Sequence, residues 1–157
     1  MAKSIRRGEK LIGTAGELYT AFELTMMGME CDLVKQDGTD VVVIKGDCVH
    51  VAQRVEVKTC TYIDRNCYNF SISKGGEKRS YTKEDCDIIA LVALEERKIQ
   101  FLPVSKVSTI KTKKLHVDTF RRDEEITQRS WKYSLGKSIE ESRDIPVSYT
   151  HLTLPTN

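Results

Sequence analysis

The sequence predicts a mixed α/β (α+β) fold, in which a first helix packs on a central sheet and a later helix follows. Two observations support this prediction. Apolar residues recur at helical spacing near the start of the chain, and short β-branched segments follow one another from Glu30 to Val104. With 157 residues and no internal repeat, one domain with a core of ordinary size is expected.

The composition excludes several classes of protein. A hydrophobic fraction of 39% with 31% charged residues is typical of a soluble globular protein. No apolar run approaches the ~20 residues that span a bilayer, and the basic N-terminus leads into no apolar signal core. The five cysteines are odd in number and form no C-x-x-C pair, which indicates free thiols. We therefore expect a cytoplasmic protein in a reducing compartment.

The end of the sequence does not fit the charged segment before it. The ten residues from Val147 to Thr156, VSYTHLTLPT, resemble a translated transposase adapter from sequencing libraries. We therefore assign residues 1–145 to the single domain and set residues 146–157 aside as a non-native tail. The natural chain is expected to continue differently after about Pro146.

The first predicted element is a helix. Between Gly8 and Met27 the apolar residues lie three or four positions apart, and Gly28 is placed as a C-terminal stop. Gly13 and Gly16 lie inside this helix, where each costs up to ~1 kcal/mol relative to alanine. Another backbone or a ligand is therefore expected to approach that face closely.

Turn signals divide the middle of the chain into strands. The expected strands cover residues 30–35, 40–45, 48–60, 68–73, 86–94 and 99–104. Gly46-Asp47 is expected to form a hairpin turn, and residues 74–85 a mobile polar loop. After Pro103 the pattern loses strand character, and a short helix anchored by Trp131 is predicted within residues 119–136.

Three acids and a lysine are the candidate functional residues. On a strand, Glu56 and Lys58 point to the face opposite the valines that flank Glu56. Asp40 can lie near Glu56 if the two strands pair, and Glu17 flanks the apolar stripe of the helix. Carboxylates of this kind hold divalent cations in phosphodiester cleavage, while a lysine orients or deprotonates water. The alternative for Glu56 and Lys58 is a solvent-facing ion pair.

These residues also carry a resemblance to a known family. Asp40 followed by Glu56-Val57-Lys58 resembles the PD-(D/E)XK nuclease motif, with Thr39 in place of the proline. The strings GTAGELYTAFELTMMGMECDLV, GTDVVVIKGDCVHVAQRVEVKT, YNFSISKGG, YTKEDCDIIALVAL and FLPVSK follow in order. This succession is similar to the branch that contains a tetrameric group I intron homing endonuclease and relatives in phages and bacteria. Members of that branch often carry Gln where Glu56 stands.

The resemblance implies a restriction-endonuclease-like core with a mixed central sheet flanked by helices. It implies a Mg²⁺-dependent DNA endonuclease, with Mn²⁺ as a substitute, that hydrolyses phosphodiester bonds of double-stranded DNA. Asp40 and Glu56 would be metal ligands, Lys58 the catalytic lysine, and Glu17 an accessory acid that also binds metal. A homodimer or homotetramer, and no membrane partner, would be expected. A non-catalytic DNA-binding module of the same fold and a Holliday-junction resolvase remain as alternatives.

Other residues are assigned from their local context. Basic side chains in Ser73–Lys83 and in Lys111–Arg122 are expected to contact DNA phosphates, although a solvated basic surface is the alternative. Asp87 is a further candidate for the site, and Arg54 is left without a role. The aromatic residues Tyr68, Phe70 and Tyr81 are expected in the core. No histidine has a companion acid at a spacing that indicates a serine or cysteine triad.

Overall fold

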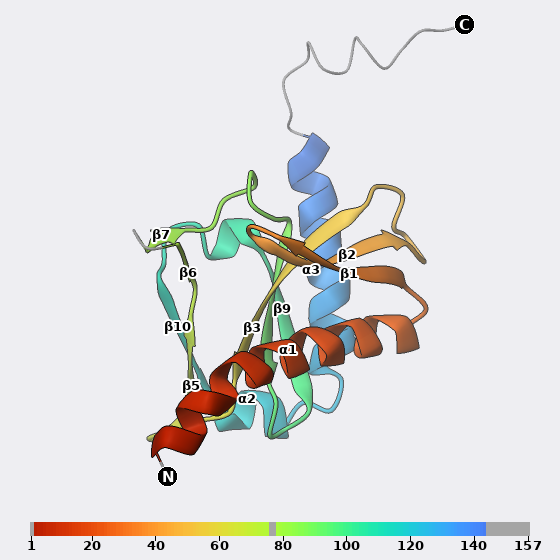
Figure 1. The fold of residues 1–157 in the computed structure, drawn as a ribbon. Coiled ribbons are helices and arrows are strands. Elements are labelled where there is room, and N and C mark those ends of the chain that lie inside the picture. Colours follow the sequence, from red (N-terminus) through yellow and green to blue (C-terminus); the bar gives the residue numbers. More distant parts are fainter. Residues whose placement is uncertain (1, 76–77, 144–157) are drawn as a thin grey trace, which may run out of the picture.

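The computed structural model describes residues 2–75 and 78–143 and shows a mixed α/β fold (Figure 1). The elements, in chain order, are α1 (Ala2–Met26), β1 (Glu30–Gln36), β2 (Thr39–Lys45), β3 (Gln53–Cys60), β4 (Ile63–Asp64), β5 (Cys67–Ser71), β6 (Ser73–Lys74), β7 (Arg79–Ser80), β8 (Ile88–Ala93), β9 (Lys98–Pro103), the 3₁₀ turn η1 (Val104–Lys106), β10 (Thr112–His116), α2 (Val117–Arg121) and α3 (Ile126–Arg143). The predicted fold class is confirmed. The adapter-like tail, residues 146–157, lies outside the described residues.

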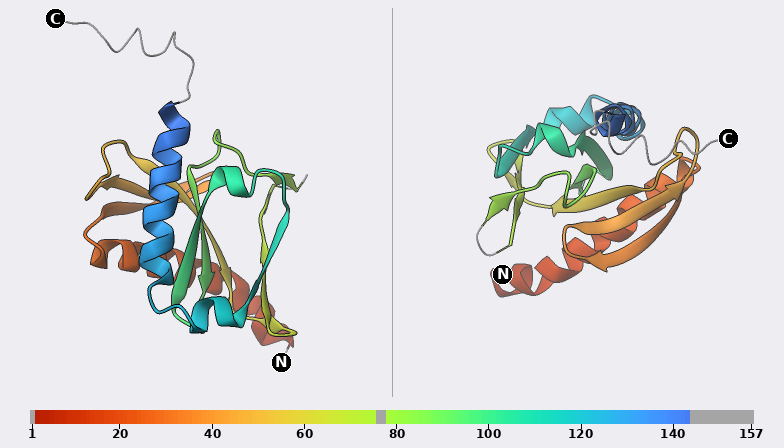
Figure 2. Two further views of the ribbon diagram at one scale, coloured as in Figure 1. Left: turned by 180° about the vertical axis from the view of Figure 1, so that it is seen from behind. Right: turned by 90° about the horizontal axis from the view of Figure 1, so that it is seen from above.

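A five-stranded mixed sheet organises the fold, in the order β1-β2-β3-β8-β9. The neighbours β3 and β8 run parallel, and the other pairs are antiparallel. A smaller sheet, β10-β5-β4, and the β6-β7 hairpin stand beside it, and α3 runs along β9 (Figure 2). As expected, β8 and β9 are joined by a tight turn, but β9 forms the sheet edge that α3 covers.

Two hydrophobic clusters use opposite faces of the central sheet. Along β8, Ile88, Ala90 and Val92 belong to the first cluster, whereas the residues between them belong to the second. The first cluster also holds Leu24, from α1, and Trp131, the predicted anchor of α3. The second cluster joins the sheet to β5, β10 and α2. The helices α1 and α3 therefore share one face, and the smaller sheet covers the other.

The predicted end of the first helix is confirmed at Gly28. Its φ of +92° is the left-handed conformation that glycine adopts without steric cost. The N–H of Gly28 donates to the carbonyl of Thr25 at 2.9 Å, and the N–H of Met29 donates to the carbonyl of Leu24 at 2.9 Å. This pair of bonds is a Schellman motif, which satisfies carbonyls that the helix end would leave unpaired. The helix begins earlier than predicted, at Ala2.

Of the two glycines, Gly13 and Gly16, that the sequence places inside the first helix, only one has a packing role. A Cβ built on Gly16 would lie 1.7 Å from Oγ1 of Thr59 in β3, so α1 approaches the sheet at this residue. A Cβ on Gly13 would meet nothing within 4 Å. The expected close approach is therefore a helix–strand contact at Gly16, one residue before Glu17.

One predicted strand boundary, one predicted loop and the end of the last predicted helix are wrong. The strand expected from Cys48 begins only at Gln53, and Val51 is 70% exposed in the segment before it. The polar segment expected to be a mobile loop contains the β6-β7 hairpin. The helix expected to end at Gly136 continues to Arg143. None of the described helices is both long enough and apolar enough to cross a bilayer.

The prediction that strand character ends after Pro103 is also wrong. The strand β10 pairs with β5 in unbroken antiparallel register, from Thr112 opposite Ser71 to His116 opposite Cys67. Within β10 only Leu115 is buried, and the two residues before it, Lys113 and Lys114, are lysines. Because one buried residue in five gives no alternation, the strand carries no recognisable period.

The contact at Gly16 can be tested by two matched substitutions. We expect Gly16→Ala to destabilise the fold by about 1–3 kcal/mol, because the added methyl group overpacks the interface with Thr59. We expect Gly13→Ala to be neutral or to stabilise the fold by up to about 1 kcal/mol, because the added methyl group meets open space and alanine has the higher helix propensity. Urea unfolding measures both, and equal effects would contradict the close approach at Gly16.

Candidate active site

The candidate site lies where β2 separates from β3, and we call this point the fork. The two strands pair from Val43 opposite Gln53 to Val41 opposite Val55, and the ladder ends there. The next residue of β2 is Asp40, and its side chain takes the place of a backbone acceptor. The N–H of Val57 donates to Oδ2 of Asp40 at 2.8 Å. This hydrogen bond fixes the Asp40 carboxylate beside Glu56.

The alternation predicted for β3 divides its side chains between the core and the site. Val55 and Val57 pack in the first hydrophobic cluster. Glu56 points to the other face, where it is only 7% exposed. Its Oε1 accepts from Nζ of Lys58 at 2.9 Å and from the hydroxyl of Tyr81 at 2.7 Å. Glu56 and Lys58 are therefore not the solvent-facing ion pair of the alternative interpretation.

The charges of three carboxylates interact at this point. Burial and the neighbouring Glu56 carboxylate raise the pKa of Asp40 to about 7, against the lowering effect of the Val57 N–H. Glu17, on α1, raises the pKa of Asp40 further. The pKa of Glu17 is itself raised, by burial and by Glu56, while Lys35 opposes the shift. The structure thus brings Asp40, Glu56 and Glu17 within electrostatic reach of one another.

Asp40, Glu56 and Glu17 do not come together as a complete set of metal ligands. Within residues 2–75 and 78–143, no three acidic, histidine or cysteine side chains converge on a point that could hold a metal ion. Asp40 and Glu56 interact most strongly, because the Glu56 carboxylate contributes more than Glu17 to the raised pKa of Asp40. Glu17 contributes charge from the adjoining helix.

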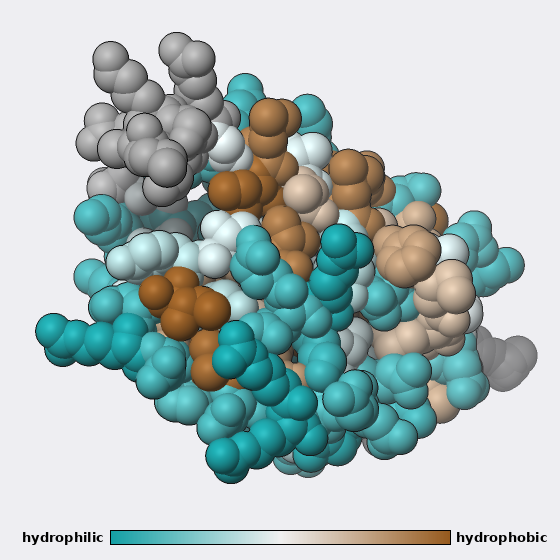
Figure 3. Space-filling view, turned by 90° about the horizontal axis from the view of Figure 1, so that it is seen from below, coloured by the Kyte–Doolittle hydropathy of each residue, from teal (hydrophilic) through white to brown (hydrophobic). Residues whose placement is uncertain are grey.

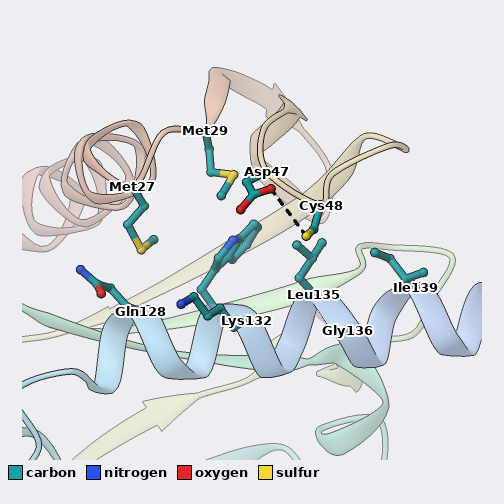
Figure 4. Close-up of a pocket in the computed structure, with 10 residues that line it drawn as sticks. Met27, Met29, Asp47, Cys48, Gln128, Lys132, Leu135, Gly136 and Ile139 are labelled. Atoms are coloured by element: carbon teal, nitrogen blue, oxygen red, sulfur yellow. Dashed lines mark hydrogen bonds between the residues drawn. The ribbon is translucent and has the colours of Figure 1, made fainter.

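A cavity lies elsewhere in the fold. It encloses about 600 Å³ between the end of α1, the turn after β2 and the face of α3 (Figure 4). Met27, Met29, Trp131, Leu135 and Ile139 supply an apolar lining, and Asp47 is its only acid. This lining has no cluster of acidic side chains that could bind a metal ion or activate water. The volume of this cavity therefore does not make it a candidate active site.

Tyr81 is a member of the site that the sequence placed only in the core. Its ring is buried in the second hydrophobic cluster, as predicted. Its hydroxyl nevertheless reaches the site, where it donates to Glu56 and accepts from Nζ of Lys58 at 2.8 Å. The same ammonium lies 4.9 Å from the ring centroid, within cation–π range. A tyrosine in a polar segment carries no period or spacing from which this contact could be predicted.

A second unpredicted feature is the ion-pair cluster around Asp85, which is only 7% exposed. Arg79 donates to both of its oxygens, at 2.9 and 2.8 Å, and Lys74 donates at 2.6 Å. The backbone N–H of Thr82 adds a bond of 2.9 Å. These donors hold the pKa of Asp85 well below its usual range. The cluster fixes the β6-β7 hairpin and the start of the segment that carries Tyr81.

The remaining candidates have structural roles. Asp87 accepts from the backbone N–H of Arg54 at 2.8 Å and from its guanidinium at 3.2 Å. The guanidinium also donates to the carbonyls of Lys83 and Glu84. Arg54, which the sequence left without a role, thus ties β3 to the segment before β8. Asp87 belongs to this tie and not to the pair formed by Asp40 and Glu56.

Comparison with solved structures finds a fold that resembles the mixed α/β fold of this chain. One matching structure is the bacterial homing endonuclease I-Ssp6803I, with a TM-score of 0.62 and 19% sequence identity, over 86% of this chain and 96% of that chain. No protein-family model and no curated protein sequence matches the chain. At this identity the likeness establishes a shared fold.

The Asp85 cluster predicts a specific acid sensitivity. Because the folded state lowers the pKa of Asp85, its contribution to stability is present above the unfolded pKa of about 4 and is lost as the pH falls below it. We expect Asp85→Asn to lose about 1–3 kcal/mol at pH 7 and to approach the wild type at low pH. Denaturant unfolding at several pH values measures the difference.

The control for this prediction is Asp37→Asn. Asp37 also pairs with Lys74, at 3.4 Å, but its side chain is 92% exposed. An exposed pair of this kind contributes about 0–1 kcal/mol. A difference between Asp85→Asn and the wild type that stays constant over the whole pH range would contradict the assignment.

Proposed function

We propose that this protein is a divalent-cation-dependent endonuclease that hydrolyses phosphodiester bonds in double-stranded DNA. One observation carries the proposal: Asp40, Glu56 and Lys58 meet at the fork between β2 and β3, on a fold shared with a bacterial homing endonuclease. The raised pKa of Asp40 supports it, because perturbed carboxylates are typical of functional sites.

The donor set at the fork suits magnesium, with manganese as a substitute. Magnesium prefers oxygen ligands and is commonly held by one or two carboxylates together with waters and substrate phosphates. Asp40 and Glu56 supply such a pair, and a cation between them would relieve the repulsion that raises the pKa of Asp40. When bound, the cation would stabilise negative charge on the attacking and leaving oxygens.

Lys58 and Glu17 have separate proposed roles around this pair. The ammonium of Lys58 is held on the rigid strand β3, where it can orient the attacking water or stabilise charge on the phosphate. Glu17 lies on α1 and contributes a further negative charge, which favours a cation at the site. It directly follows Gly16, where the helix is in close contact with Thr59 of β3.

The basic side chains divide into those with acidic partners and those without. In the segment before β8, Lys74 and Arg79 are engaged by Asp85. Beyond β10, Arg121 pairs with Glu96 and Arg122 with Asp118. Three lysines have no such pair in the part of the chain that the structure describes. They are Lys113 and Lys114, in β10, and Lys111, directly before it. We propose that these three neutralise DNA phosphates.

We further propose that the active form is a homodimer or homotetramer joined through α1. Four large apolar side chains of this helix are 53–72% exposed, at helical spacing on one side: Leu11, Leu18, Phe22 and Met26. A row of hydrophobic side chains also crosses the molecule in the view from below (Figure 3). A second copy is the occupant that the spacing fits. An antiparallel partner related by a two-fold axis beside Leu18 would set Leu11 against Met26 and Phe22 against the small Ala15.

The catalytic assignment is tested by Lys58→Ala. We expect cleavage of double-stranded DNA with Mg²⁺ to fall by about 10²–10⁴-fold, because the water loses its positioned ammonium, while DNA affinity is kept. The control is Lys132→Ala, an exposed lysine on α3 outside the site, which should cleave like the wild type. Single-turnover cleavage and gel-shift titration supply the two measurements.

The same assay separates this proposal from its alternatives. Linear, supercoiled and four-way-junction DNA are incubated with Mg²⁺ or EDTA. Cleavage of the junction alone would indicate a resolvase, and metal-dependent cleavage of none of them would indicate a DNA-binding module. Undiminished cleavage by Lys58→Ala beside an active wild type would overturn the mechanism.

The self-association interface is tested by Leu18→Glu. A charge at the centre of the apolar row should prevent its burial, so the variant should sediment as a monomer where the wild type sediments as a dimer or tetramer. Val51→Glu is the control, because Val51 is also exposed but lies in the loop before β3. A wild type that remains monomeric at high protein concentration, or an unchanged Leu18→Glu oligomer, would refute this interface.

A further inference from the structure

Three polar groups form a closed triangle at the fork. The hydroxyl of Tyr81 donates to Oε1 of Glu56 at 2.7 Å and accepts from Nζ of Lys58 at 2.8 Å. The third side is the 2.9 Å ion pair between Lys58 and Glu56. Each group therefore has two fixed partners. One oxygen of Glu56 is committed to this triangle, and the second takes no part in it.

The tyrosine is held independently of the two charged residues. Its ring is 3% exposed in the second hydrophobic cluster, on the side of the sheet that Glu56 faces. The next residue, Thr82, is bound through its N–H to the Asp85 carboxylate. That carboxylate also holds Arg79, two positions before the tyrosine. Packing from one side and the ion-pair cluster from the other thus fix the position of the hydroxyl.

We propose that Tyr81 is the positioning residue of the site: its hydroxyl orients the Glu56 carboxylate toward Asp40 and holds the Lys58 ammonium in place. The inference rests on the proposed nuclease function and assigns a role to a residue outside the motif formed by Asp40, Glu56 and Lys58. Without the hydroxyl, Glu56 keeps only its ion pair with Lys58, and Lys58 keeps that pair and its contact with the ring. The carboxylate is then free to rotate about its terminal bond, and the amine follows it.

Tyr81→Phe tests this role, because it removes the hydroxyl and keeps the buried ring. The matched control is Tyr68→Phe. Tyr68 is a fully buried tyrosine of the same hydrophobic cluster, and its hydroxyl donates to Glu96 at 3.2 Å, outside the candidate site. Both variants lose one hydrogen bond from a buried ring, so a merely structural effect should be similar in the two.

We expect Tyr81→Phe to lower the single-turnover rate at saturating DNA by about 10–100-fold, with the dissociation constant for DNA unchanged. Its affinity for Mn²⁺, measured by titration without DNA, should fall by a similar factor, whereas Tyr68→Phe should match the wild type in both. This second readout does not depend on turnover.

The outcomes separate the two proposals. An active wild type together with a Tyr81→Phe variant that keeps its rate and its Mn²⁺ affinity overturns the role of Tyr81 and leaves the nuclease intact. Equal losses in Tyr81→Phe and Tyr68→Phe overturn it too, because they would reflect a general loosening of the core. A wild type that cleaves no DNA overturns the proposed function, and the role of Tyr81 with it.

Discussion

The hydrogen bond from the N–H of Val57 to the Asp40 carboxylate is the contact on which the site depends. The ladder between β2 and β3 ends at Val41, so the backbone of β3 needs another acceptor at this point. Asp40 supplies it from its side chain, and this brings its charge beside that of Glu56. The same contact therefore ends the strand pairing and places two acids together. It allows the fork to stay open without leaving a backbone donor unpaired.

The two carboxylates at the fork repel each other, and the repulsion is reduced differently at Glu56 and at Asp40. Lys58 and Tyr81 bind Glu56 directly, while Asp40 responds with a pKa raised to about 7. The Asp85 cluster differs, because its donors fully match its charge and its pKa is lowered. The Asp85 carboxylate, which has several hydrogen-bond donors, stabilises the hairpin. Asp40 and Glu56, which repel each other, are suited to binding a cation. The contrast separates the structural cluster around Asp85 from the proposed cation site.

Hydrophobic period and turn chemistry were sufficient to predict the local elements of the fold, but not the contacts between distant segments. The helix end at Gly28, the five strands of the central sheet and the division of β3 between core and site are all set by local patterns. The strand β10 was missed because a single buried residue gives no alternation. Tyr81 and Asp85 were missed because their polar segment takes its structure from ion pairs and packing. The roles of Asp40, Glu56, Lys58 and Glu17 remain predictions that the geometry supports.

The central claim is that Asp40 and Glu56 together form a site for a divalent cation. Calorimetric titration of the DNA-free protein with Mn²⁺ tests it most directly, with Asp40→Asn as the variant and Asp64→Asn, an exposed acid on β4, as the control. We expect saturable binding by the wild type and by Asp64→Asn, and a loss of at least about tenfold in affinity for Asp40→Asn. Equal binding by all three proteins, or no binding by the wild type, would contradict it.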